Sequence, residues 1–213
     1  DAAGAELYTV GNYAQIKVLA SDFDGWLLLW GTIGTDEIVI PNWGASIRSI
    51  YLHSFTTSNN LILNVWRNLY RSINRINSGI ERIDAMNSEQ IDEDLKNKYI
   101  GEHKFLRAML YFSLVSTWEN IPLILEESKS EDIGNFEVSQ SSAKEVYNQI
   151  IEDLLFAESV LDEVQGQGRA TKGAAQALLG KVYLQMTGSP LNETDKYTLA
   201  AVSYTHLTLP TTW

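Results

Sequence analysis

Four carboxylates in the first part of the chain are the residues most easily imagined in catalysis. Glycoside hydrolysis needs two carboxyl groups held at a fixed separation across the bond that breaks. The candidates are Asp22, Asp24, Asp36 and Glu37. Nothing in their spacing fixes such a separation, and carboxylates in solvated loops or at helix caps are far commoner than catalytic pairs. We therefore expect no catalytic residue in this chain.

The other side chains that commonly react or bind metals are absent or isolated. There is no cysteine, which excludes thiolate nucleophiles, disulfides and zinc sites built on cysteine. His53 and His103 each stand alone, without a second histidine at metal-ligand spacing, and His206 lies close to the end of the chain. The sequence therefore predicts neither a metal site nor a cofactor.

The overall charge argues against one large class of ligand. The chain has 213 residues, with 16 Lys and Arg against 27 Asp and Glu, so its net charge is −11. Proteins that bind nucleic acid neutralise phosphates with basic surfaces, and this balance has the opposite sign. We expect no nucleic-acid partner. No apolar run approaches the roughly 18 residues that a membrane-spanning helix needs.

A row of three arginines and one isolated arginine stand out against this acidic background. Arg67, Arg71 and Arg75 follow one another at intervals of four, which places them along one face of a helix. This basic row could pair with carboxylates of neighbouring helices or contact a partner, and pairing inside the molecule is the commoner outcome. Arg107 lies in a strongly apolar stretch, so we expect it to reach a buried carbonyl or carboxylate and to serve the fold.

Apolar residues recur at intervals of three and four over residues 61–83, which predicts a long amphipathic helix. These residues are Leu61, Ile62, Val65, Trp66, Leu69, Ile73, Ile76, Ile80 and Ile83. A second helix is predicted from Asn87, with Gln90 as its capping partner, to Pro122. Ser142 and Glu145 form a capping box for a third helix through Leu161. Thr171 caps a fourth helix, which ends at Gly188.

The region before Ser58 is less regular. It contains a predicted helix near Val10–Leu19, several glycines and a short β-rich run at Glu37–Ile40. The predicted fold is therefore mainly α, with packed antiparallel helical hairpins of about the size of a tetratricopeptide unit and an irregular N-terminal lobe.

Five blocks of sequence, in a fixed order, resemble the SusD/RagB-like nutrient-binding lipoproteins of the Bacteroidetes outer membrane. The blocks are Thr35–Glu37 with Pro41, Leu52–Thr56, Trp66–Asn77, Gly101–Leu123 and Gly168–Leu184. The resemblance covers the chain from Asp22 to about Ala201. Residues 1–201 are therefore expected to be the N-terminal part of a SusD-like glycan-binding domain. Residues 202–213 resemble a translated adapter and are expected to be a non-native tail.

This resemblance implies a non-catalytic protein that captures glycans and delivers them to a TonB-dependent transporter of the SusC type. It also implies a location on the extracellular face of the outer membrane, through a lipid anchor on a cysteine that this chain lacks. A helical protein-interaction scaffold without a carbohydrate ligand is the alternative, because tetratricopeptide-like helix pairs often bind polypeptides.

A glycan site needs aromatic faces that stack on sugar rings, together with amides that bind hydroxyl groups. Trp43 and Asn42 are the best candidates, because they follow Pro41 in a loop where no helical pattern demands an apolar residue. The alternative is that Trp43 packs under its own loop. For Trp26 and Trp30, and for Trp66 and Trp118, packing is the favoured interpretation.

Overall fold

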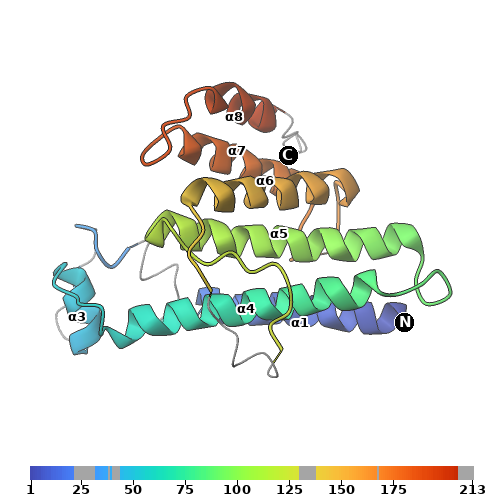
Figure 1. Ribbon diagram of the computed structural model, residues 1–213, viewed down its shortest axis with the longest axis horizontal. Coiled ribbons are helices and arrows are strands. Elements are labelled where there is room, and N and C mark those ends of the chain that lie inside the picture. Colours follow the sequence, from blue (N-terminus) through green and yellow to red (C-terminus); the bar gives the residue numbers. More distant parts are fainter. Residues whose placement is uncertain (22–31, 38, 40–43, 130–137, 167, 206–213) are drawn as a thin grey trace, which may run out of the picture. The chain divides into compact units, whose positions relative to one another are not determined.

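The computed structural model describes residues 1–21, 32–37, 39, 44–129, 138–166 and 168–205. Within these residues the chain forms seven α-helices, and its only β-pairing is an isolated antiparallel bridge between Ile121 and Ser141 (Figure 1). The helices are α1 (Ala2–Ser21), α3 (Ala45–Tyr51), α4 (Asn60–Asp84), α5 (Glu93–Trp118), α6 (Ala143–Val160), α7 (Lys172–Met186) and α8 (Lys196–Thr205). The prediction of a mainly α fold is confirmed.

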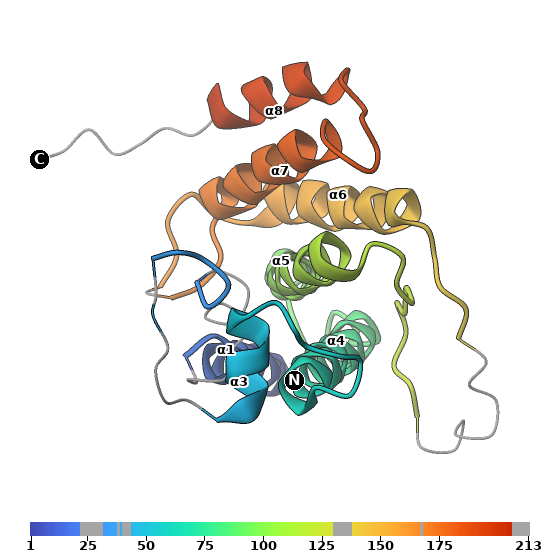
Figure 2. The ribbon, with the colours of Figure 1, turned by 90° about the vertical axis from the view of Figure 1, so that its left-hand side faces the viewer.

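The chain divides into two compact units. One unit contains Asp1–Val10 and Ile73–Trp213, and the other contains Gly11–Ser72. In the first unit, α5, α6, α7 and α8 follow one another in a stack, and each helix runs opposite to the one before it (Figures 1 and 2). The predicted antiparallel packing is therefore present, whereas the tetratricopeptide class of these hairpins stays a prediction.

The predicted start of the first helix is wrong. The helix begins at Ala2 instead of near Val10, because the Asp1 carboxylate accepts a hydrogen bond from the backbone N–H of Gly4 at 2.8 Å. This capping bond satisfies one of the backbone donors that a helix leaves free at its first turn. The N-terminal lobe is therefore more helical than predicted. In the predicted strand, Glu37 lies in a turn and Val39 in irregular backbone, while Ile38 and Ile40 lie outside the described residues.

The Asn87–Gln90 pair forms, but it does not start the second long helix. The backbone N–H of Asn87 donates to the Gln90 side-chain oxygen at 3.0 Å within a turn. The helix starts after Asp92, whose carboxylate accepts from the backbone N–H groups of Asp94 and Leu95. A carboxylate at this position also interacts favourably with the helix dipole, which explains why it caps the helix in place of Asn87.

The other two predicted caps are confirmed. Ser142 and Glu145 form the reciprocal capping box of α6, with the Ser142 N–H donating to Glu145 Oε2 at 2.8 Å and the Glu145 N–H donating to Ser142 Oγ at 3.3 Å. Thr171 Oγ1 accepts from the backbone N–H of Ala174 at 3.2 Å at the start of α7. Both caps are local in sequence, which is why sequence alone identifies them.

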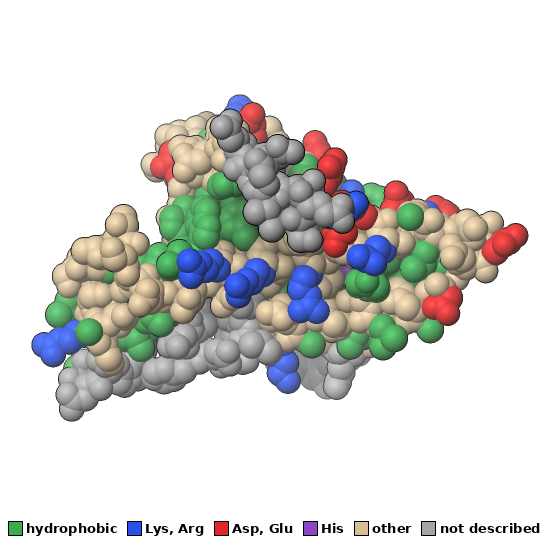
Figure 3. Space-filling view, turned by 60° about the horizontal axis from the view of Figure 1, so that its bottom comes forward, with side chains coloured by type: hydrophobic (Ala, Val, Ile, Leu, Met, Phe, Trp, Pro, Cys, Tyr) green, Lys and Arg blue, Asp and Glu red, His purple; other side chains and the backbone are tan. Residues whose placement is uncertain are grey.

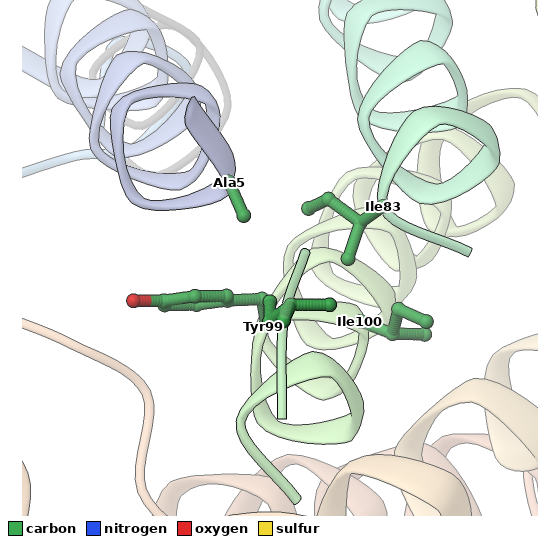
Figure 4. Packing of buried hydrophobic residues seen from close by; sticks show 5 residues of the cluster. Ala5, Ile83, Tyr99 and Ile100 are labelled. Carbon is green, nitrogen blue, oxygen red and sulfur yellow. The ribbon is translucent and has the colours of Figure 1, made fainter. Parts of the chain in front are cut away.

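A buried cluster joins the ends of three helices in the first unit. Ala5 of α1 and Ile83 of α4 point toward Tyr99 and Ile100 of α5 (Figure 4), and Ile91 completes the cluster. Ala5 and Ile83 have no exposed surface. A small alanine side chain allows α1 to approach α5 closely, so the first turns of α1 are fixed by packing as well as by the Asp1 cap.

A buried ion pair lies between α5 and α6. Arg107 Nε donates to Asp153 Oδ2 at 2.7 Å, and Arg107 Nη2 donates to Asp153 Oδ1 at 2.8 Å. The Arg107 and Asp153 side chains are 6% and 1% exposed. Arg107 Nη1 also donates to the Asn77 side-chain oxygen and to the Leu125 carbonyl. The prediction that Arg107 reaches a buried carbonyl or carboxylate is confirmed by the buried Asp153 carboxylate.

The same region fixes the chain that leaves α5. Asn77 Nδ2 donates to the carbonyls of Ile124 and Glu126 at 3.0 and 3.1 Å. The Tyr111 hydroxyl donates to the Ile124 carbonyl and accepts from the Ile124 N–H. Side chains of α4 and α5 therefore provide this extended segment with the hydrogen bonds that a neighbouring strand would otherwise supply.

We expect Arg107→Met to lower the free energy of unfolding by about 3 kcal/mol or more, because it leaves the Asp153 carboxylate buried without its counter-charge. Urea denaturation followed by circular dichroism measures this change. The exposed Arg82→Met is the matched control and should cost less than about 1 kcal/mol. Equal losses in the two variants would contradict a special role for the buried pair.

Candidate functional site

The predicted sugar-contacting residues, Asn42 and Trp43, lie outside the described residues. The same is true of Asp22, Asp24, Trp26 and Trp30. The structure does describe both ends of the segment that carries Trp43, here called the Trp43 loop and defined as residues 35–44. Both ends belong to the unit Gly11–Ser72. Hydrogen bonds hold the residues at each end.

The first end of the Trp43 loop is a hydrogen-bonded turn. The backbone N–H and the hydroxyl of Thr35 both donate to the Thr32 carbonyl, at 3.1 and 2.8 Å. Ile33, inside this turn, has no exposed surface. His53 Nε2 lies 3.1 Å from the Gly34 carbonyl, so a residue just beyond α3 holds the turn from outside. A Cβ at Gly34 would lie 3.1 Å from His53 Cε1, and a side chain there would crowd this contact.

The second end is fixed by Asn59. Its side-chain Nδ2 donates to the Ser46 carbonyl at 2.9 Å and to Ser49 Oγ at 3.0 Å, both in α3. Its Oδ1 accepts from the backbone N–H groups of Leu61 and Ile62 at the start of α4. Asn59 therefore caps α4 and binds α3 with the same amide, and it is buried. The helix that follows the Trp43 loop is held in place from its first turn.

Sequence reasoning considered His53 only as a metal ligand and did not single out Asn59. A signal for Asn59 exists, because an asparagine directly before a run with helical periodicity is a typical N-cap. Its contacts with α3 and the contact of His53 with Gly34 join residues that are 10 to 19 positions apart. No local pattern reveals such pairs.

The structure offers no support for a metal or carboxylate centre in the part of the chain that it describes. Within that part, no group of three or more His, Asp or Glu residues has an arrangement that could hold a metal ion. Asp36 and Glu37 are exposed neighbours near the start of the Trp43 loop. No helix among the described residues is long and apolar enough to cross a membrane.

The most extensive ion-pair cluster among the described residues joins α1, α5 and the segment before α7. Arg169 donates to both carboxylate oxygens of Glu102, at 2.9 and 2.7 Å, and to Glu6 at 2.6 Å. Burial opposes a charged Glu6, but hydrogen bonds from Tyr99 and Arg169 outweigh it and lower the pKa of Glu6. Burial, and then the hydrogen bond to Glu6, raise the pKa of Tyr99 to about 12. The cluster therefore has a structural role.

His103 lies next to this cluster and is fully buried. Its Nδ1 is 2.7 Å from the Tyr99 carbonyl, whereas its buried Nε2 has no hydrogen-bond partner among the described residues. Burial lowers the pKa of His103 below its ordinary value of 6.5. The hydrogen bond to Tyr99 opposes this shift, and the positive charge of Arg169 adds to it. His103 is therefore held as a neutral side chain at neutral pH.

The tryptophans predicted to pack in the core occupy its margin. Trp66 and Trp118 are both half-buried, and the Trp66 ring lies 4.9 Å from the Tyr70 ring, measured between centroids. On the same helix, Arg67 and Arg71 are exposed, and neither forms an ion pair with a described acidic residue. Figure 3 shows Lys and Arg side chains following one another in a line on the face that it presents.

Residues 35–184 match the sequence profile of a family described as starch-binding and associating with the outer membrane. A SusD-like protein of Bacteroides ovatus is 32% identical over 123 residues, which are 58% of this chain and 22% of that protein. The chain therefore spans about a fifth of this curated relative's length.

Solved structures of SusD-like proteins resemble this structure over nearly the whole chain. The crystal structure of a SusD homologue from Bacteroides thetaiotaomicron superposes with a TM-score of 0.77 and 28% identity, covering 97% of this chain and 40% of that one. A laminarin-binding SusD-like protein superposes with a TM-score of 0.77 and 26% identity, covering 96% of this chain and 43% of that one.

We expect the stability of the chain to fall as the pH is lowered from about 7 to 5.5, because His103 binds its proton more weakly in the folded than in the unfolded state. Because the pKa of His103 is lower in the folded than in the unfolded state, its contribution to the free energy of unfolding is complete above pH 6.5. This contribution is lost as the pH falls toward the pKa of the folded state. The expected loss is at most about 1.4 kcal/mol per pH unit.

Thermal melts of the wild type, His103→Gln and the exposed control His53→Gln over this pH range measure the effect. His103→Gln should flatten the pH dependence, whereas His53→Gln should leave it as in the wild type. An unchanged slope in His103→Gln would show that other groups control stability in this range.

Proposed function

Because this chain belongs to the SusD-like family, whose profile matches residues 35–184, we propose that it forms part of a protein that binds glycans at the bacterial cell surface. The family is non-catalytic and associated with the outer membrane. The match carries the proposal, since it includes the Trp43 loop together with the residues that hold its two ends.

In the proposed site, Trp43 supplies an aromatic face for a sugar ring and Asn42 supplies amide hydrogen bonds. A pyranose ring presents C–H groups beside hydroxyls, so this pair of side chains suits both kinds of surface. The contacts of His53 with Gly34 and of Asn59 with α3 support this assignment, because a loop with fixed ends has less freedom to lose on binding. A structural relative is named as laminarin-binding, which supports a glucan-type oligosaccharide as a first ligand to test.

The wider assembly is also part of the proposal. We propose that the complete protein lies on the extracellular face of the outer membrane, held by a lipid anchor, and passes its glycan to a SusC-like TonB-dependent transporter. The family's association with the outer membrane supports this location. The alternating helices α5 to α8 form tetratricopeptide-like hairpins in this proposal.

We expect Trp43→Ala to weaken binding of laminarin oligosaccharides about tenfold, as loss of one aromatic stacking contact typically costs about 1–1.5 kcal/mol. Isothermal titration calorimetry measures the change. Tyr197→Ala is the control, because Tyr197 is an exposed aromatic residue in α8.

Two other outcomes are informative in this experiment. Equal binding by Trp43→Ala and the wild type would remove Trp43 from the site and leave glycan binding intact. A folded wild-type protein that binds no glycan of a neutral and acidic panel, but binds the purified transporter, would favour the protein-interaction scaffold.

A further inference from the structure

The segment that follows the Trp43 loop has an unusual charge distribution. Residues 44–72, all of them described, contain three arginines and no Asp, Glu or Lys, in a chain with a net charge of −11. Two of these arginines, Arg67 and Arg71, lie one turn apart on α4, and both side chains are exposed. Like charges at this spacing destabilise a helix slightly, so the sequence maintains this pair at a small cost to the fold.

Exposed arginines on a helix are usually explained by ion pairs within the protein, and no such pair is found for these two among the described residues. Among the arginines, Arg82, Arg107 and Arg169 form ion pairs there, and no ion pair joins Arg67 or Arg71 to a described carboxylate. Acidic residues are plentiful in the chain as a whole, with 27 of them in the sequence. The two guanidinium groups are therefore available to a ligand that carries negative charge.

The surroundings of the two arginines favour a sugar over other anions. Trp66 and Tyr70 precede Arg67 and Arg71 by one residue each, their rings lie 4.9 Å apart at an angle of 47°, and both side chains are half-buried. Leu63, one turn earlier, is 38% exposed. Asn60 and Asn64 continue the arginine row toward the start of α4, and both are exposed. Aromatic and apolar surface beside amides suits the C–H groups and hydroxyls of a sugar ring.

We propose that this surface of α4 binds the negatively charged groups of an acidic glycan, either uronate carboxylates or sulfate esters. The surface, here called the α4 arginine face, consists of Asn60, Asn64, Trp66, Arg67, Tyr70 and Arg71. A guanidinium group binds carboxylate and sulfate through paired hydrogen bonds that an uncharged sugar does not provide. This inference rests on the proposed glycan-binding function and adds acidic glycans to the ligand classes of that function.

The test is calorimetry at about 0.05 and 0.5 M NaCl, where charge interactions at exposed sites are weakly and strongly screened. The probes are an oligogalacturonate, a sulfated carrageenan oligosaccharide, a neutral laminarin oligosaccharide and a polyaspartate peptide. The variant is Arg67→Gln/Arg71→Gln. The matched control is Lys129→Gln/Lys181→Gln, which removes the same charge from exposed sites in the other unit. Circular dichroism checks that all proteins have the same helix content.

We expect at least one acidic oligosaccharide to bind more tightly at the lower salt concentration, and the arginine variant to weaken it about tenfold. The control should change it less than twofold, and laminarin binding should be equal in all three proteins. Whichever of the two acidic probes binds more tightly identifies carboxylate or sulfate as the recognised group.

Four results would overturn the inference. If laminarin binds but neither acidic probe does, or if both variants weaken the acidic probes equally, the α4 arginine face is not the site and the proposed glycan-binding function stands. If polyaspartate alone shows the arginine-dependent binding, the surface recognises an acidic protein segment instead. If the folded wild type binds none of the glycans, the proposed function fails together with the inference.

Discussion

The buried ion pair of Arg107 and Asp153 is the constraint on which the larger unit depends. A charged side chain in the interior is tolerated only when its hydrogen-bonding groups are satisfied, and here α4, α5, α6 and the segment after α5 each contribute a partner. The pair therefore selects one relative arrangement of these elements. Apolar contacts alone would allow neighbouring helices to slide or rotate at lower cost.

The hydrogen bonds around this pair also fix the first part of the segment that follows α5, at Ile124–Glu126. Asn77 binds Arg107 with its oxygen and the backbone of the segment with its nitrogen, so one amide links the ion pair to the extended chain. Nearby, the antiparallel bridge joins Ile121 to Ser141, the residue before the capping box of α6.

Features that are local in sequence could be predicted, and features that depend on distant residues could not. The periodicity of residues 61–83 and the caps at Ser142 and Thr171 gave correct helices, because each signal depends on residues three or four positions apart in the chain. The early start of α1 was missed because its first turns are rich in Ala and Gly and have no apolar periodicity. Arg107 could be predicted to find a buried partner, but Asp153 is 46 residues away and could not be identified.

The candidate site also combines features that are local in sequence with features that depend on distant residues. The types of Trp43 and Asn42 drew attention to their loop, whereas the side chains that anchor it, His53 and Asn59, act across distances that sequence patterns do not report. Arg67, Arg71 and Arg75 were visible as a row, and pairing inside the molecule was the expected outcome. No ion pair joins Arg67 or Arg71 to a described acidic residue, whereas Arg75 does interact within the molecule.

The amide of Asn59 has a consequence for how such proteins diversify. The four hydrogen bonds of the Asn59 side chain join α3 to α4, and their partners Ser46, Ser49, Leu61 and Ile62 all lie after Gly44. A change in the length of the chain before Gly44 therefore leaves these four bonds in place. Sequence variation on that side of α3 is uncoupled from the geometry of the two helices.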